Sequence, residues 1–167
     1  GNLIGGRGVT IKNVSAVTYQ AMKFPGAPWG LKMACGENPK RVYGGKGRSP
    51  MTRMGNVAGY RAAFIEAQSY MRTWDKYLAG KGKSDSGDGK KKDGGEKSDG
   101  DPPTRDLAKE TLMGAMKGDI RVQIHCYRAD EMALMIDLAK EFGFKIASFH
   151  HGVEAYKIAD LLAAEGV

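Results

Sequence analysis

The C-terminal part of the sequence repeats one pattern, a strand followed by a helix, and a histidine lies where each strand ends. Residues 120–124 alternate apolar and polar side chains, which predicts a β-strand that ends near His125. A run of apolar residues at helical spacing follows. A second strand over 144–148 leads to His150 and His151, and a second helix comes after them. Alternating units of this kind predict parallel strands joined by right-handed crossovers.

The positions of the histidines indicate a metal site. Because the carboxyl ends of parallel strands share one edge of a sheet, where α/β folds bind ligands, His125 and either His150 or His151 should lie about 5 Å apart. Imidazole nitrogens bind divalent metals at about 2 Å, so this pair can share one ion. The alternative is that each histidine is an ordinary hydrogen-bonded turn residue, and the pattern alone leaves that reading open.

Lys32 is a second candidate, because it lies between Leu31 and Met33 in a short apolar strand. It is either an edge charge that reaches solvent through its long stem or a functional amine in a partly buried site. Burial lowers the pKa of a lysine, and a neutral amine can act as a nucleophile or take up carbon dioxide to become a carbamate ligand. The residues by themselves do not decide between these roles.

The remaining segments predict an ordered chain with one polar interruption. The expected elements are a strand over 9–14, a helix over 16–22, a turn and glycine-rich loop over 36–48, and helices over 51–79 and 106–117. Lys40 and Arg41 lie in that loop and are candidates for binding an anionic part of a substrate, with a solvated loop as the alternative. Residues 80–103 contain no aliphatic or aromatic side chain and predict a flexible low-complexity loop within a single domain over 1–167.

Composition excludes several other classes. The net charge of +7 comes from scattered basic residues without a nucleic-acid motif, so we expect no nucleic-acid partner. No apolar run reaches the roughly 18 residues of a membrane span, and no signal peptide begins the sequence, so we expect no membrane partner. The compartment is left open. Two cysteines do not make a disulfide framework, and Cys126 is expected to be a buried packing thiol on the opposite side of its strand from His125.

Four segments resemble one family, the metal-dependent amidohydrolases, and in particular their imidazolonepropionase-like branch of bacterial proteins. They are IHCYRADEM at 124–132, FHHGVEAYKIADLL at 149–162, GLKMACGENPKRVYG at 30–44 and PMTRMG at 50–55. The resemblance implies a (β/α)8 TIM-like barrel with one or two divalent ions, zinc being the expected one. It also implies that His125 and His151 are metal ligands, with His150 as the alternative, and that Lys32 is the lysine that becomes carboxylated in binuclear members.

The sequence also departs from this family. The HxH motif of the first strand and the aspartate of the eighth strand are absent, and a whole barrel needs about 250 residues. We therefore expect a central portion of a hydrolase, truncated or completed by the remaining barrel segments or a second copy, which cleaves a C–N bond of a small amide or cyclic amide with metal-activated water. The alternative is a non-catalytic α/β fragment or binding module with an incomplete metal site.

Overall fold

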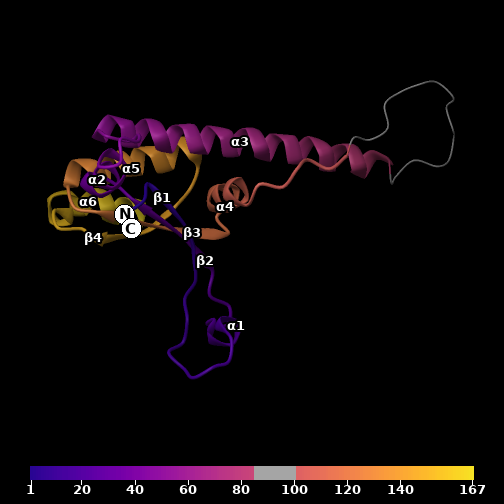
Figure 1. Ribbon diagram of the computed structural model, residues 1–167, viewed down its shortest axis with the longest axis horizontal. Helices are drawn as coiled ribbons and strands as arrows, with labels where there is room; N and C mark the ends of the chain where they lie inside the picture. Colours follow the sequence, from indigo (N-terminus) through magenta and orange to yellow (C-terminus); the bar gives the residue numbers. More distant parts are fainter. Residues whose placement is uncertain (85–100) are drawn as a thin grey trace.

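The computed structural model describes residues 1–84 and 101–167, which form a mixed four-stranded sheet with helices packed on it (Figure 1). The strands lie in the order β1-β2-β3-β4, where β2, β3 and β4 are parallel and β1 is antiparallel to β2. Their bounds are β1 Ile4–Gly8, β2 Trp29–Ala34, β3 Ile120–Cys126 and β4 Ile146–His151. The helices are α1 Tyr19–Met22, α2 Glu37–Gly44, α3 Arg53–Ser84, α4 Leu107–Met116, α5 Ala129–Phe142, the 3-10 helix η1 Ala155–Ile158 and α6 Ala159–Glu165.

The two C-terminal strand–helix units are confirmed. β3 and β4 are neighbouring parallel strands, and α5 connects them. Asp130 and Glu131 lie in the first turn of α5, where negative charge is favoured. Gly143 ends the helix with φ 77° and donates its N–H to Ala139 O, as glycine after a helix commonly does. Local sequence signals therefore set both ends of this helix.

One hydrophobic core lies between the helices and one face of the sheet. Buried residues of α3, α4 and α5 pack together with Leu31, Val122 and Ile124 of the strands. The opposite face of the sheet carries partly buried polar side chains, including Lys32 and Gln123, which are partners in the register of β2 and β3. The alternation of residues along each strand thus separates a packed apolar face from a polar one.

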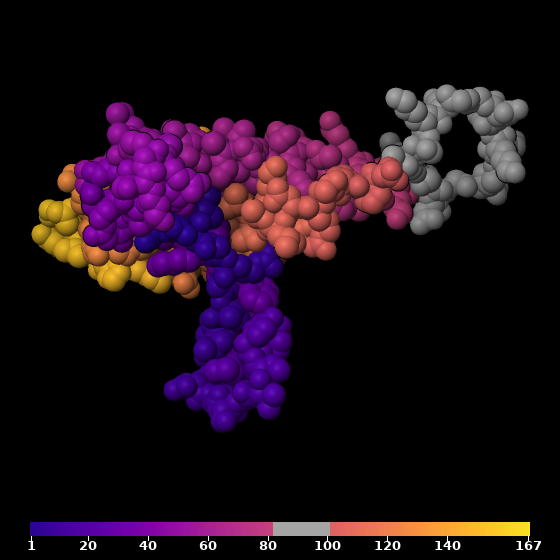
Figure 2. Space-filling model, in the orientation of Figure 1, coloured from indigo at the N-terminus to yellow at the C-terminus, as the bar shows by residue number. Residues whose placement is uncertain are grey.

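The α/β class is confirmed, but the expectation of parallel strands only is wrong, and the described residues do not form a full barrel. The strand predicted over 9–14 lies instead at Ile4–Gly8 and pairs with β2 in a hairpin, which makes it antiparallel. Residues 9–28 form an arm that extends away from the rest of the molecule (Figures 1 and 2). The apolar side chains of this arm, such as Val9 and Ile11, are exposed, so they do not anchor it to the core.

Two further predictions, for the segments that contain α2 and α3, are corrected by the structure. The loop expected over 36–48 contains α2, because Pro39 is tolerated in the first turn of a helix and Glu37 favours its N-terminus. Helix α3 runs to Ser84, beyond the predicted 51–79 and into the segment expected to be a flexible loop. The rest of the 80–103 prediction falls mostly on residues 85–100, which lie outside the described residues. Within the part of the chain that the structure describes, no helix is long and apolar enough to cross a bilayer.

Candidate active site at the ends of the strands

The predicted site residues His125, His150, His151 and Lys32 lie together at the carboxyl ends of β2, β3 and β4. His125 and His150 are partners in the register of β3 and β4. The ring centroids of His125 and His151 are 4.5 Å apart in an edge-on arrangement. Lys32 Nζ lies 2.7 Å from His150 Nδ1. The structure therefore brings all three histidines of the chain and the candidate lysine to one rim of the sheet.

The backbone conformation of His151 allows the side chains of two consecutive histidines, His150 and His151, to lie at the same rim of the sheet. In a regular strand, successive side chains point to opposite faces, which would separate His150 from His151. His151 instead has φ 71°, in a left-handed region that residues other than glycine seldom adopt. The strand therefore ends its regular alternation here, so His150 contacts Lys32 while His151 contacts His125. Unusual backbone of this kind is common at functional sites.

Two residues that the sequence did not single out complete the surroundings of His125. The Asn38 side-chain amide, from the first turn of α2, hydrogen-bonds to His125 Nε2. The Tyr127 ring lies 4.6 Å from the His125 ring and 5.5 Å from the His151 ring. Asn38 follows the end of β2 just as Tyr127 follows the end of β3, so their position at the carboxyl edge of the sheet is the signal that could have identified them.

A cavity of about 270 Å³ opens at this rim and is lined by Lys32, Asn38, His125 and His151 together with backbone near Gly1 and Gly5. Lys40 and Arg41 are not part of its lining. They lie on α2, where Lys40 forms an ion pair of 2.8 Å with Glu37. Their role in substrate binding stays a prediction.

Burial and positive neighbours shift the titration of the site. Burial lowers the pKa of Lys32. Burial also lowers the pKa of His125, and the nearby His151 and Lys32 add to this effect. The pKa of His150 is lowered by burial and then by Lys32 and His151. His125 and His150 are therefore held in the neutral form near neutral pH, and neutral imidazole is the form that binds metals.

The donor set at the rim is nevertheless partial. Within the described residues, one group of three histidine, cysteine or acidic side chains has its donor atoms within 4.8 Å of one another. This group is Cys35, Cys126 and Glu131, and it does not include the histidines of the rim. The lining of the histidine cavity contains no carboxylate. A catalytic ion at the rim would therefore need further ligands besides the histidines, which agrees with the absence of the HxH motif and of the late aspartate.

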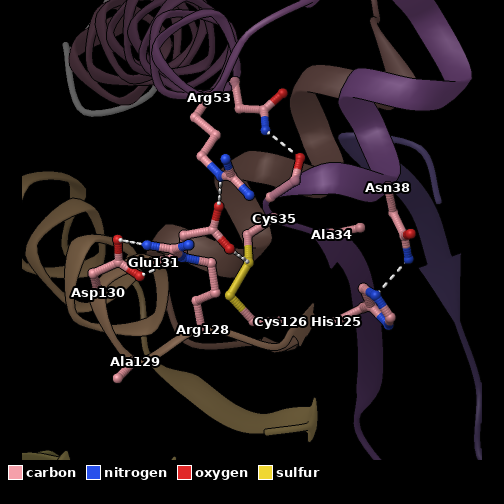
Figure 3. The surroundings of a disulfide bond; sticks show 12 residues. Ala34, Cys35, Asn38, Arg53, His125, Cys126, Arg128, Ala129, Asp130 and Glu131 are labelled. Carbon is pink, nitrogen blue, oxygen red and sulfur yellow. Dashed lines mark hydrogen bonds and ion pairs between the residues drawn. A yellow bond between two sulfur atoms is a disulfide. The ribbon is translucent and has the colours of Figure 1, made fainter. Parts of the chain in front are cut away.

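The expectation of a packing thiol at Cys126 is wrong, because Cys126 forms a disulfide with Cys35 (Figure 3). Ala34 and His125 are partners in the register, so the two cysteines come next at the ends of β2 and β3, with Cα atoms 5.3 Å apart. Cys126 is fully buried, on the apolar side of the sheet. The sequence alone did not predict this disulfide, because 91 residues separate the two cysteines and only the pairing of the strands brings them together.

Comparisons with known proteins agree with the family resemblance at a general level. No model of a protein family matches the sequence. The chain is 35% identical over 132 residues to amidohydrolase tasK of Hapsidospora irregularis. The matched region covers 79% of this chain and 12% of that protein. Its fold is similar to the crystal structure of an amidohydrolase from Thermotoga maritima MSB8, with a TM-score of 0.77 and 34% identity.

The structural similarity covers 99% of this chain and 38% of the Thermotoga protein, so the chain spans well under half the length of either relative. Neither protein's name refers to the imidazolonepropionase-like branch, and that finer assignment stays a prediction. In sequence and in fold, this chain is therefore similar to part of two proteins named amidohydrolases.

Proposed function

We propose that the histidine rim belongs to a metal-dependent hydrolase that cleaves a C–N bond of an amide or cyclic amide, with zinc as the ion. The observation that carries this proposal is the contact of the His125 and His151 rings, 4.5 Å apart, at the carboxyl ends of two parallel strands. The similarity to proteins named amidohydrolases supports the reaction class. The choice of an amide or cyclic amide as substrate is part of the proposal.

The residues at the rim fit a divalent ion. His125 and His151 would hold it, with His150 as the alternative, because imidazole nitrogen is a preferred zinc ligand and the lowered pKa of His125 keeps that ring neutral. Such an ion supplies Lewis acidity and an activated water, which hydrolysis of an amide requires. Asn38 contacts Nε2 of His125 and thereby orients its ring.

Lys32 has two alternative states in this proposal, an ammonium group and a carbamate, and each has its own role. Its ammonium group is within hydrogen-bond distance of His150 Nδ1, so it fixes the orientation of that ring. Its lowered pKa eases the loss of a proton, and a neutral amine is the form that reacts with carbon dioxide to give a carbamate. Carboxylated Lys32 would add the negatively charged oxygen ligand that the rim otherwise lacks.

We further propose that this chain is a central portion of the barrel. The chain spans 12% and 38% of the two similar proteins, so their remaining length is sufficient to supply more strands. The polar sheet face with Lys32 and Gln123 would face the interior of a closed barrel, where the missing ligands are expected. The missing segments or a second copy would provide them.

The second candidate is a non-catalytic fragment or binding module. The observation in its favour is the partial donor set, since the cavity lining has no carboxylate to complete an ion's coordination or to accept a proton. In that case the rim binds an ion, but the chain does not catalyse hydrolysis.

Metal analysis combined with a hydrolysis assay separates the two candidates. The disulfide-intact chain would be dialysed against Zn²⁺, measured for bound zinc, and assayed with a panel of linear and cyclic amides. We expect about one zinc per chain and a loss of at least tenfold in affinity for His125→Ala. The matched control is Gln123→Ala, two residues earlier on the same face of β3, which should keep its zinc. Zinc without turnover supports the second candidate, and equal losses in both variants contradict the proposed site.

A further inference from the structure

A second cluster of donor atoms lies on the opposite side of β3 from the histidines. Sγ of Cys35, Sγ of Cys126 and a carboxylate oxygen of Glu131 all lie within 4.8 Å of one another, and all three residues are buried. Figure 3 shows these side chains converging from the ends of β2 and β3 and from the first turn of α5. Two sulfurs and a carboxylate are suitable ligands for a zinc-like ion once the sulfurs are thiolates.

A small cavity beside this cluster contains a polar atom without a partner. The cavity has a volume of about 30 Å³ and is lined by Cys35, Glu131 and Asn56, among others. Asn56 is only 3% exposed; its Nδ2 donates to Gly36 O at 2.8 Å, and its Oδ1 has no hydrogen-bond partner. Buried polar atoms are nearly always satisfied, so an amide side chain with a lone oxygen in the lining of a cavity shared with Cys35 and Glu131 points to a bound species. The cavity has room for one small species such as an ion.

The charges around the cluster also suit a divalent cation. Arg53 Nε donates to Oε1 of Glu131 at 2.6 Å, whereas Oε2 faces Cys35 Sγ at 3.9 Å. One carboxylate oxygen is thus held by the arginine, and the other is directed toward the sulfurs. Two thiolates and a carboxylate carry three negative charges, which a divalent ion and the Arg53 guanidinium together neutralise. Arg53 acts as the outer partner that fixes a ligand, as is usual around metal sites.

We propose that reduction of the Cys35–Cys126 disulfide creates a second metal site for a zinc-like divalent ion. Its protein ligands are the two thiolates and Glu131 Oε2, and the small cavity beside them, which Asn56 also lines, has room for a water as a further ligand. A dithiol reductant gives two electrons and two protons, so the S–S bond breaks, two thiols form and the reductant becomes a disulfide. The two thiols release their protons to solvent when the ion binds. The oxidised protein has no thiolate, so the redox state of the pair controls the site.

This site is independent of the hydrolase proposal, but it lies next to the histidine rim. Cys126 directly follows His125, and the Cys35 N–H donates to His125 O at 2.8 Å. The disulfide in the oxidised state and the ion in the reduced state would each connect the ends of β2 and β3. In both states the strand ends that carry the histidine rim are held together.

Cobalt titration tests the proposal without any assay of activity. The chain would be reduced with a dithiol, freed of reductant without oxygen, checked for two free thiols, and titrated with Co²⁺. We expect a near-ultraviolet thiolate-to-cobalt absorption band that saturates at about one equivalent, and no such band in the oxidised protein, which is a control of identical sequence. Cys126→Ser should lose most of the band, and Glu131→Gln, which removes the carboxylate charge but keeps the size of the side chain, should weaken cobalt binding about tenfold. Circular dichroism would show that each variant is folded.

The double variant His125→Ala/His151→Ala separates the two metal sites. It should keep the thiolate band, so failure of the hydrolase proposal leaves this test intact. The proposal is overturned if the folded, fully reduced chain gives no thiolate band, if the band survives in Cys126→Ser, or if it disappears in the histidine variant. A disulfide that withstands reduction in the folded chain overturns it as well.

Discussion

Replacing Phe64 by Ala should destabilise the chain more than any surface change, because this side chain joins α3 to the rest of the core. Phe64 is fully buried, and its ring stacks on Phe142 at 5.2 Å and on Phe144 at 4.7 Å. Truncation of a buried phenylalanine costs about 3–5 kcal/mol. Aromatic contacts worth roughly 0.5–1.5 kcal/mol each are part of that cost, and Phe64 makes two of them, so we expect a loss in the upper part of this range, about 4–5 kcal/mol.

Urea unfolding followed by circular dichroism measures this loss. With a urea dependence of about 2 kcal/mol per molar, the midpoint should fall by about 2 M. Phe24→Ala is the matched control, because Phe24 is 49% exposed on the arm of residues 9–28, and it should change stability by less than about 0.5 kcal/mol. A loss below about 2 kcal/mol for Phe64→Ala, or equal losses in the two variants, would refute the packing of α3 on α5 and the sheet.

Three further predictions concern the site and its supports. Tyr60→Phe removes the hydroxyl that donates to a buried carbonyl at the end of β2, so the free energy of unfolding should fall by about 1–3 kcal/mol in urea titrations. Gly36→Ala should cost clearly more stability than Gly47→Ala, because both have positive φ but only the Cβ at 36 would lie 2.5 Å from a buried carboxylate oxygen; equal costs would contradict that contact. The pKa values of His125 and His150 in the folded chain are lowered from 6.5, so below that pH the unfolded chain binds more protons than the folded chain. The free energy of unfolding should therefore decrease as pH falls from about 7 to about 5. Replacing both histidines by glutamine should flatten this slope, and an unchanged slope would contradict it.

Periodicity predicted the C-terminal half well, because there local signals and tertiary structure agree. The alternation that ends at His125 and the helical spacing after it correspond to β3 and α5, and the following unit to β4. The gathering of the histidines followed from one rule, that parallel strands share a carboxyl edge. The contact of Lys32 with His150 also lies at that edge, although the sequence left the role of this lysine undecided.

The features that the sequence did not reveal depend on long-range contacts or on backbone detail. The disulfide joins Cys35 and Cys126, and only the strand register brings them together. The helix that contains Lys40 was hidden by glycines and a proline, residues that usually indicate a turn. The positive φ of His151 has no signal in the sequence, yet it allows two consecutive histidines to reach one rim.

Nuclear magnetic resonance of the imidazole nitrogens tests the histidine metal site most directly. The chain has three histidines, and all of them lie at the rim, so ¹⁵N-histidine labelling reports on this site alone. On addition of one equivalent of Zn²⁺ to the disulfide-intact protein, one ring nitrogen of His125 and one of His151 should move to metal-bound chemical shifts. Ring nitrogens that stay unchanged in all three histidines at saturating zinc would contradict the proposed site.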